Sequence, residues 1–262
     1  MLTSDCGVSV IVPAFNACQT INAGIASVVA QTVQRLEIVI IDDHSNDGTW
    51  DEIRRLMVGD SRIRAYRQEK PSGGPACPRN IGVQLARYPL VAFLDADDLW
   101  HPQKLELQLA ELWQRPTAFL CSAMRDFRSD SEIVYRQPEG RAVQFVTFQM
   151  QRRRARIPTS SVLASREALL EHPFDERPSY RAVEDYDCWL RILSTGVVCT
   201  KVGHELVYYR KTGSQLSKGK GSMLGKVFMV HRAFSGGNVA SAFLYTATHA
   251  LGGIVRHLTK RM

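Results

Sequence analysis

The sequence lacks several features that would point to common classes of small protein. Its six cysteines lie far apart and form no C-x-x-C string, which argues against a zinc site and against a dithiol redox motif. No low-complexity tract and no repeat of fixed period is present, which disfavours solenoids and coiled coils. Cysteines with apolar neighbours are typical of buried free thiols in a reducing compartment. These residues are Cys6, Cys18, Cys77, Cys121, Cys188 and Cys199.

The N-terminal segment MLTSDCGVSVIVPAFN lacks the basic start and the cleavage site of a secretory signal peptide. Its apolar run, 8–12, is rich in β-branched residues and stops at Pro13, which predicts a first strand. Basic residues outnumber acidic ones, and the net charge of +7 suits an anionic partner such as a nucleotide, a lipid headgroup or a nucleic acid. The charge alone does not distinguish among these three.

Apolar runs and helical periodicity alternate through the first part of the chain. The expected strands are 8–12, 36–41, 62–67 and 90–94, and the expected helices between them are 20–31, 49–57 and 77–87. This alternation predicts an α/β fold with a mainly parallel, Rossmann-like central sheet flanked by helices. After residue 116 the alternation fades. There we expect strands at 118–124 and 132–135, a helix at 183–193 and a β-hairpin at 197–209.

Polar loops follow three of the expected strands. Right-handed crossovers bring the carboxyl ends of parallel strands to one edge of a sheet, where open α/β sheets bind ligands. The loops after Val12, Ile41 and Leu94 should therefore share one crevice. Their ligand-capable side chains are Asn16, Asp42, Asp43, Asp95, Asp97 and Asp98.

Four short strings carry groups that suit a phosphate-bearing substrate and a metal ion. The acids of DADD, 95–98, can serve one hard cation and one ribose, although acids also end strands and cap helices. GGPACPRNIG, 73–82, begins a helix whose N-terminus would favour phosphate, but no G-K-[ST] follows and a tight turn is the plain alternative. DDHSNDGT, 42–49, offers acceptors to a nucleobase or a ribose, or is a polar loop. VEDYDCWL, 183–190, places acids at a helix start, where one can act as a general base or merely stabilise the helix.

Together and in this order, these strings resemble family 2 of the inverting glycosyltransferases, of the bacterial surface-polysaccharide type. The matching strings are VSVIVPAFNA (8–17), LEIVIIDDHSNDGT (36–49), GGPACPRNIG (73–82), VAFLDADDLWHPQKL (91–105) and VEDYDCWLRI (183–192), with a weaker match at YYRKTGSQLS (208–217). The resemblance implies the GT-A fold with a C-terminal helical tail. It also implies transfer of a sugar from a nucleoside diphosphate donor, foremost a UDP-sugar, to a saccharide or a lipid-diphosphate-linked saccharide in polysaccharide or glycan biosynthesis.

The same resemblance suggests how the chain is divided. Residues 1–115 would form the nucleotide-sugar-binding half, and 116–220 the half of the same domain that binds the acceptor and holds the catalytic base. Residues 221–262 would form the helical tail.

The resemblance further implies roles for individual residues. Asp185 matches the general base that takes the proton of the acceptor hydroxyl in a single displacement, and Asp97 matches the ligand of Mn²⁺ or Mg²⁺. The residues implied to bind the nucleotide are Pro13, Ala14, Phe15, Asn16, Asp43, Arg79, Asn80, Asp95 and Ala96. Those implied to shape the acceptor or donor pocket are Glu184, Trp189, Arg210, Lys211 and Ser214. Many members carry a histidine in this last stretch; here 210–214 has none, so its other polar residues are expected to meet the diphosphate.

Two other classes stay open on the residues alone. A nucleotidyltransferase, or another nucleotide-sugar enzyme on a similar sheet, would carry a glycine-rich phosphate loop after the first strand, where this chain has PAFNA. A non-enzymatic protein that binds nucleic acid or another anion is suggested by the charge and by QRRRAR, 151–156. No aromatic residue interleaves this basic run, so nucleic acid is not expected as a partner. We expect the run in a loop, either beside the acceptor cleft or far from it.

The tail contains no Asp, Glu, Lys or Arg from Ala233 to Val255. Its apolar stripe comprises Phe243, Leu244, Leu251, Ile254, Val255 and Leu258. This predicts an amphipathic helix that either lies on a membrane or packs on the domain. A cytoplasmic protein is expected, and the first option would place it at the inner face of the plasma membrane.

Overall fold

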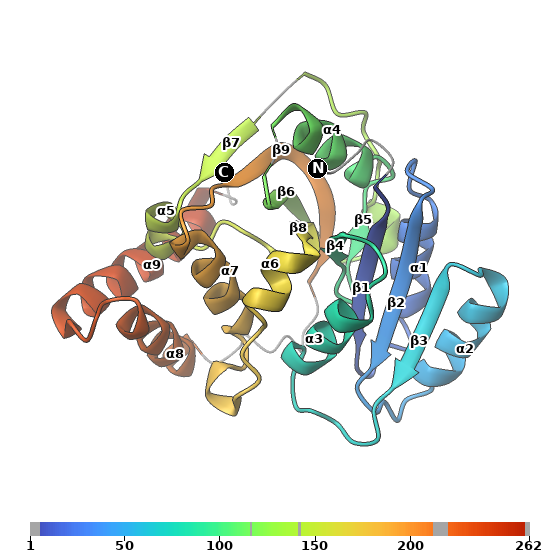
Figure 1. Ribbon diagram of the computed structural model, residues 1–262, viewed down its shortest axis with the longest axis horizontal. Coiled ribbons are helices and arrows are strands. Elements are labelled where there is room, and N and C mark those ends of the chain that lie inside the picture. The colour runs from blue at the N-terminus through green and yellow to red at the C-terminus, as the bar shows by residue number, and fades with distance from the viewer. Residues whose placement is uncertain (1–5, 116, 141–142, 212–219, 260–262) are drawn as a thin grey trace.

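The computed structural model describes residues 6–115, 117–140, 143–211 and 220–259 of the 262-residue chain. One sheet runs through the protein, with helices on both of its faces (Figure 1). The strand order is β3-β2-β1-β4-β8-β6-β9-β5, and β7 pairs with β9. All six cysteines are free thiols, and three of them are buried.

The N-terminal half forms the parallel part of this sheet. Its strands are β1 (Val8–Ala14), β2 (Leu36–Asp42), β3 (Ile63–Arg67) and β4 (Leu90–Phe93), all paired in parallel. The connecting helices are α1 (Ile21–Val29), α2 (Thr49–Gly59) and α3 (Ala76–Leu85). Side chains of α1 and α2 cover one face and those of α3 the other, which is why β1, β2 and β4 are buried along their whole length. The predicted elements of this half are thus confirmed to within a few residues.

From residue 99 onward the chain continues the same sheet with mixed strand directions. The strands of this part are β5 (Leu99–Trp100), β6 (Phe119–Phe127), β7 (Val143–Val146), β8 (Leu163–Ser165) and β9 (Cys199–Arg210). Strand β8 is antiparallel to β4 and β6, β5 is antiparallel to β9, and β6 is parallel to β9. The predicted parallel order therefore holds for the first half, and the whole sheet is mixed. The boundary predicted at Arg115 falls just after a helix, but the β4–β8 pairing joins both halves into one sheet.

Two predictions for the C-terminal half are wrong. The hairpin expected at 197–209 is the single strand β9, which forms ladders with β5, β6 and β7. Its Gly203-His204 pair looks like a turn in the sequence, but it lies where the register with β6 shifts, at a bulge. The strand expected at 132–135 is instead the end of the 3₁₀ turn η1 (Asp130–Glu132) followed by chain without regular secondary structure.

The remaining helices close the two faces of the sheet. Those of the domain body are α4 (Lys104–Gln114), α5 (Phe148–Arg153), α6 (Arg166–Glu171) and α7 (Glu184–Ser194), with 3₁₀ turns η2 (Thr159–Ser161) and η3 (Pro178–Tyr180). Helix α4 adds to the cluster of α1 and α2, while α6 and α7 join α3 in the second cluster. Helix α7 therefore lies on the same face as α3.

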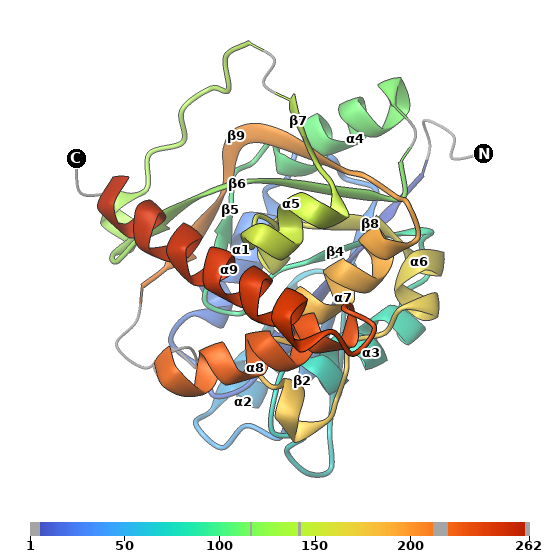
Figure 2. The same cartoon turned by 90° about the vertical axis from the view of Figure 1, so that its left-hand side faces the viewer.

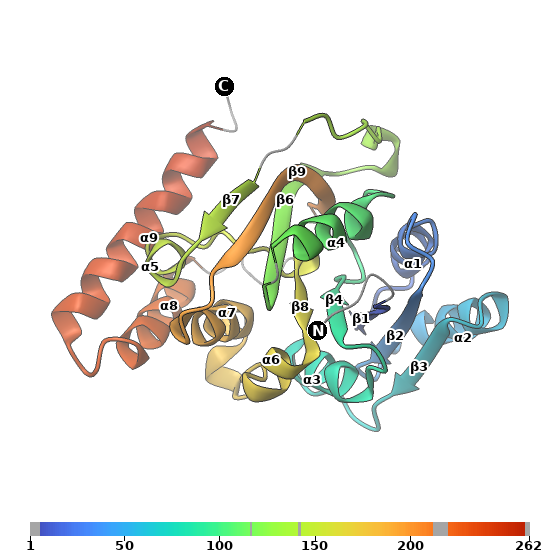
Figure 3. The same ribbon diagram turned by 45° about the horizontal axis from the view of Figure 1, so that its top comes forward.

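The tail forms two helices, α8 (Lys220–Ala233) and α9 (Val239–Thr259), which lie side by side against α5 and α7 (Figures 2 and 3). Val227 and Val230 of α8 are buried against Tyr186 and Leu190 of α7. The tail was predicted either to lie on a membrane or to pack on the domain, and the structure shows it packed on the domain. Across the described ranges, no helix is long and apolar enough to cross a membrane.

Candidate active site

Hydrogen bonds join the loops that follow β1 and β2. The backbone amide of Asn16 donates to Ser45 Oγ at 2.9 Å, and the side-chain Oδ1 of Asn16 accepts from the backbone amide of Asn46 at 3.1 Å. Asn16 adopts a positive φ of 49°, a conformation that asparagine tolerates better than most residues. Pro13 and Ala14 are buried at the end of β1, and the exposed Phe15 projects beyond them. The structure thus brings the predicted first nucleotide loop and the second loop together at one edge of the sheet.

Asp43 sits at that edge as a buried carboxylate. It accepts hydrogen bonds from the Ser72 amide at 2.7 Å and from the Ser72 hydroxyl at 2.9 Å, and also from Gln68. These bonds hold the segment between β3 and α3 over the strand ends. Asp43 therefore lies at the predicted site, and its carboxylate holds the segment between β3 and α3 in place.

The acid loop, which we define as Asp95–Asp98, follows β4 and contains acids in different surroundings. Asp98 is fully buried and accepts from Ser160 Oγ at 2.6 Å and from the Arg210 amide at 3.1 Å. Burial, and then the charge of Asp95, raises the pKa of Asp97 to about 6. Asp95 is one-third exposed and paired with an arginine, while Ala96 is buried between the acids. Asp98 therefore holds the loop in place, and Asp95 and Asp97 remain the acids that a ligand can reach.

A buried arginine connects the acid loop to the start of α7. Arg79 Nη2 lies 2.7 Å from Asp95 Oδ1, and Arg79 Nη1 lies 3.1 Å from Glu184 Oε1. Burial opposes the charge of Arg79, but the carboxylates around it, Asp95 foremost, raise its pKa overall. Breaking such a buried pair on one side leaves an uncompensated charge, so this bridge holds α3, α7 and the acid loop together.

The first turn of α7 presents the predicted base. Ala182, just before it, has a positive φ of 70°, a strained conformation for alanine. Asp185 is half-buried and accepts from Thr159 Oγ1 at 2.9 Å. Burial, and then the neighbouring Asp185, raises the pKa of Glu184. The strained entry to the helix thus places two acids side by side, one on Arg79 and the other on Thr159.

The end of β9 closes the site from another side. Arg210 Nε donates to the Asp97 carbonyl at 2.8 Å, and Arg210 Nη2 lies 2.7 Å from Asp130 Oδ1. Lys211 Nζ lies 3.8 Å from Asp126 Oδ2. Arg210 therefore touches the acid loop, as its predicted place in the pocket requires, and Lys211 is drawn toward β6. Ser214 lies outside the described residues.

Two of the predicted site residues serve the fold instead. Trp189 is fully buried between the rings of Phe93, Phe119 and Phe174, so it does not line a pocket. It points inward with the other apolar residues of α7 that belong to the same core cluster, Cys188, Ile192 and Leu193. The Asn80 side chain bonds to the backbone of Phe174 and to Glu176, which commits it to the loop before α7 rather than to a nucleotide.

The first part of the basic run 151–156 differs from the predicted loop, because α5 extends to Arg153, while 154–156 do lie in a loop. Arg152 lies in α5, buried, with its guanidinium 3.7 Å from the Tyr245 ring and 2.8 Å from Ser235 Oγ. It therefore anchors the tail rather than an acceptor. An arginine inside a polar string gives no sign in the sequence that it will be covered by a distant helix.

Sequence reasoning missed two hydroxyl residues, Thr159 and Ser160. Both are buried in η2, and each bonds to one of the acids described above. The string IPTSSVL, 157–163, contained a weak signal, since it places adjacent hydroxyls inside an apolar stretch.

The acids fit a divalent cation with few protein ligands. Among the residues described, no group of three or more His, Cys, Asp or Glu side chains forms a metal cage. Mg²⁺ and Mn²⁺ accept oxygen ligands, and Mg²⁺ usually keeps several waters and binds through one or two carboxylates plus substrate phosphates. Asp95 contributes to the raised pKa of Asp97, so the two carboxylates lie close to each other, as two oxygen ligands of one cation must.

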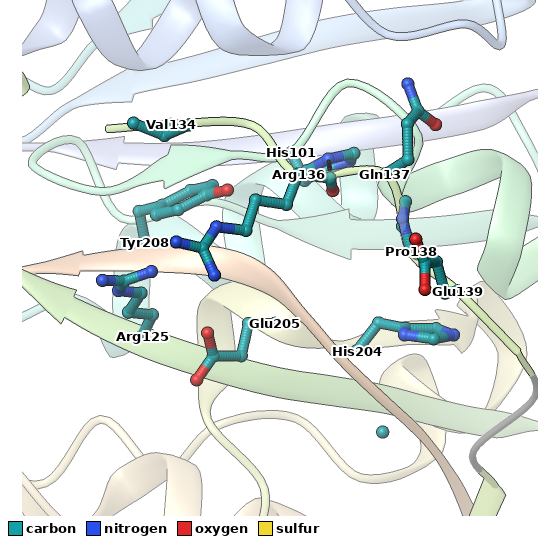
Figure 4. A pocket seen from close by; sticks show the side chains of 11 residues that line it. His101, Arg125, Val134, Arg136, Gln137, Pro138, Glu139, His204, Glu205 and Tyr208 are labelled. Carbon is teal, nitrogen blue, oxygen red and sulfur yellow. Dashed lines mark hydrogen bonds between the residues drawn. The ribbon is translucent and has the colours of Figure 1, made fainter. Parts of the chain in front are cut away.

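A cavity of about 290 Å³ lies apart from these residues (Figure 4). Its lining includes His101, Arg125, Arg136, His204, Glu205 and Tyr208, and none of the predicted site residues. Tyr208 faces this cavity, whereas the charge of Asp98 raises, after burial, the pKa of the adjacent Tyr209. Because consecutive side chains of a strand point to opposite faces, the cavity and the acid loop lie on opposite sides of β9.

Two solved glycosyltransferases share this fold. S. aureus TarS 1–349 in complex with UDP-GlcNAc aligns with a TM-score of 0.69 and 18% identity, over 86% of this chain and 65% of that one. The chain spans 39% of the longer TarS chain. The mannosyltransferase PcManGT from Pyrobaculum calidifontis, in complex with GDP-Man and Mn²⁺, aligns with a TM-score of 0.68 and 15% identity, over 95% and 74% of the two chains. The chain thus shares the GT-A fold of these structures.

The sequence comparisons specify the family. The model of Glycosyl transferase family 2 matches residues 9–174. The putative teichuronic acid biosynthesis glycosyltransferase TuaG of Bacillus subtilis is 30% identical over 86% of this chain and 87% of its own. WfgD of Escherichia coli, a UDP-Glc:α-D-GlcNAc-diphosphoundecaprenol β-1,3-glucosyltransferase, is 30% identical over 95% and 94%. The chain belongs to glycosyltransferase family 2. The protein is therefore a glycosyltransferase and not a nucleotidyltransferase, the other enzyme class that the sequence left open.

Proposed function

We propose that this glycosyltransferase moves a sugar from a UDP-sugar to a saccharide linked to a lipid diphosphate, with inversion, in the assembly of a surface polysaccharide. The observation that carries the proposal is the Arg79 bridge. It places Asp185, on α7, next to the acid loop at the end of β4. A base beside a diphosphate site is what a single displacement requires.

In this proposal the parts of the site have distinct tasks. The loops after β1 and β2, with Asn16 and Asp43, hold the nucleoside. Asp185 takes the proton of the acceptor hydroxyl as that oxygen attacks the anomeric carbon from the face opposite the diphosphate. Arg210, which touches the acid loop, adds positive charge near the leaving group.

Asp97, with Asp95 beside it, would hold the Mn²⁺ or Mg²⁺. A cation there supplies positive charge that neutralises the departing diphosphate. The fit rests on two reachable carboxylates that lie close enough for the charge of Asp95 to raise the pKa of Asp97.

The choice of donor and acceptor rests on relatives. WfgD and WfaP are both named for UDP-glucose and a diphosphoundecaprenol-linked acceptor, and TarS has been solved with UDP-GlcNAc. A lipid-linked acceptor would place the protein at the inner face of the plasma membrane. The exposed apolar side chains of α9, Phe243, Leu244 and Leu251, suit peripheral contact there.

The test has two stages. Thermal unfolding with UDP-, GDP-, CMP- and dTDP-sugars, each with and without Mn²⁺, should show the largest rise in Tm for a UDP-sugar with Mn²⁺. The selected donor is then incubated with GlcNAc-diphosphoundecaprenol, and NMR determines the anomeric configuration of the product. Retention of configuration would contradict the single displacement, and a preference for another nucleotide would contradict the UDP assignment.

A further inference from the structure

We propose that Thr159 and Ser160 are positioning residues that hold the base-bearing helix α7 and the acid loop at a set distance from each other. The inference rests on the proposed function, because it takes Asp185 as the base and the acid loop as the diphosphate side of the site.

The two hydroxyls lie on adjacent residues and reach opposite sides of the site. Thr159 Oγ1 donates to Asp185 Oδ2 at 2.9 Å. Ser160 Oγ donates to Asp98 Oδ2 at 2.6 Å and accepts from the Asp95 amide at 3.1 Å. Because Cα atoms joined by a trans peptide are about 3.8 Å apart, one peptide unit fixes the offset between the base and the acid loop.

The turn that carries these hydroxyls is itself held from below. Trp100 Nε1 donates to the Ser160 carbonyl at 2.8 Å, and Gln108 Nε2 donates to the Ser161 carbonyl at 2.8 Å. Lys104 Nζ donates to Gln108 Oε1 at 2.8 Å and lies 3.9 Å from the centroid of the Trp100 ring. A buried lysine is costly unless it is well satisfied, so a network that keeps one here indicates a rigid support.

The hydroxyl of Thr159 bonds directly to the carboxylate of Asp185, whereas the Arg79 bridge does not. Arg79 bonds to Glu184, one residue before the base, through a long side chain. Asp185 Oδ1 accepts from the amide of the next residue in its own helix, Tyr186. The bond from Thr159 therefore ties the carboxylate of the base itself to a different part of the chain.

Loss of this tie should affect turnover more than donor binding, because misplacing a catalytic group by about 1 Å can cost on the order of a hundredfold in rate. Thr159→Val keeps the shape of the side chain and removes the hydroxyl, whereas Thr159→Ser keeps the hydroxyl. We expect Thr159→Val to lower kcat on the order of tenfold with an unchanged Kd for UDP and Mn²⁺, and Thr159→Ser to keep most of the turnover. Ser160→Ala should instead weaken binding of UDP with Mn²⁺ several-fold, since it releases the acid loop.

The measurements are titration calorimetry with UDP and Mn²⁺, and UDP release from UDP-glucose with GlcNAc-diphosphoundecaprenol. Thr200→Val, at a buried threonine of β9, is the matched control and should resemble the unmodified protein in both assays. Thermal unfolding verifies that each variant is folded. If Thr159→Val unfolds, the Thr159→Ser result decides: near-normal turnover supports the proposal and a large loss overturns it.

Asp185→Asn separates this inference from the proposed function. Full turnover of Asp185→Asn would overturn the role of Asp185 itself. If Asp185→Asn is impaired while Thr159→Val and Ser160→Ala behave like Thr200→Val, the proposed function stands and the positioning role is wrong. In the double variant Thr159→Val, Asp185→Asn, no further loss of kcat supports the proposal, and a full additional loss contradicts it.

Discussion

The acids of the site differ in what surrounds each carboxyl group, although three of them share one short string. Burial raises the pKa of both Asp97 and Asp98. Asp98 is fully buried and accepts hydrogen bonds from the Ser160 hydroxyl and the Arg210 backbone amide, whereas Asp97 is only partly buried. At the residue scale, burial therefore separates the acid that supports the loop from the acid that is suited to a cation.

Asp97→Ala should abolish transfer and remove the dependence of UDP binding on Mn²⁺, because it takes away the proposed main oxygen ligand. Titration of UDP with and without Mn²⁺ measures this, and Tm should stay near that of the unmodified protein. Asp51→Ala, an exposed acid of α2, serves as the control. Unchanged activity in excess EDTA would rule out a required metal.

Asp185→Asn should lower kcat on the order of a hundredfold or more with little change in donor affinity, because the amide cannot accept the acceptor's proton. Asn is close in shape and can keep the bond from Thr159, so the change tests proton transfer rather than position. Steady-state kinetics with donor and acceptor each varied provide the measurement. If donor affinity collapses while turnover at saturation survives, Asp185 is a binding residue.

At the scale of elements, the tail packs against the helix that carries Asp185, the proposed base. Helices α8 and α9 contact α5 and α7, and the Tyr186 hydroxyl, one residue after Asp185, lies 2.7 Å from His231 Nε2. Removing 223–262 would uncover the apolar residues of α7 that α8 buries, so the catalytic half is not expected to close without the tail.

The buried His231 should make stability depend on pH. Burial, followed by His249 and Arg152, lowers the pKa of His231 from 6.5 to about 4. The unfolded chain therefore binds a proton between these values and the folded chain does not. The contribution of neutral His231 to the free energy of unfolding is complete above pH 6.5 and is lost as the pH falls toward 4. This lowering of the pKa from 6.5 to about 4 corresponds to about 3 kcal/mol of stability at most.

Urea unfolding at pH 7 and pH 5 tests this dependence. His231→Gln should lose less stability on acidification than the unmodified protein, because its side chain does not titrate. His204→Gln, at a half-exposed histidine of β9, is the control and should keep the original pH dependence. An identical loss in His231→Gln and the unmodified protein would contradict the role of His231.

At the scale of the whole molecule, α9 leaves one apolar side uncovered. Phe243, Leu244 and Leu251 are each more than 60% exposed, while Ala242 on the opposite side is fully buried. Together with the net charge of +7, this side suits an anionic bilayer near a lipid-linked acceptor.

Replacing Phe243, Leu244 and Leu251 with serine should abolish flotation with vesicles of anionic lipid at low salt, because the apolar contact is lost. The fold should persist, since these side chains do not contribute to the core. Val58→Ser, at a 92% exposed valine of α2, is the matched control and should float like the unmodified protein. If the unmodified protein also fails to float, the membrane contact should be abandoned.

The sequence by itself determined the parallel half of the sheet and the family. Runs such as 36–41 are buried on both faces, so their continuous apolar composition is enough to predict a strand. The polar loops that follow such runs can be recognised from the neighbouring sequence in the same way. Asp43, Asp95 and Asp97 could be named as candidates for this reason, because a strand end is visible without knowledge of its neighbours.

Only the tertiary structure decided which side chains share a surface. Trp189 was turned into the core, Arg152 was covered by α9, and Gly203-His204 became a bulge inside one strand instead of a turn. Thr159 and Ser160 acquired their contacts in the same way, from acids that precede and follow them by many residues. The physical reason is that burial and hydrogen bonding between distant segments depend on how the elements pack, and local periodicity contains no record of that packing.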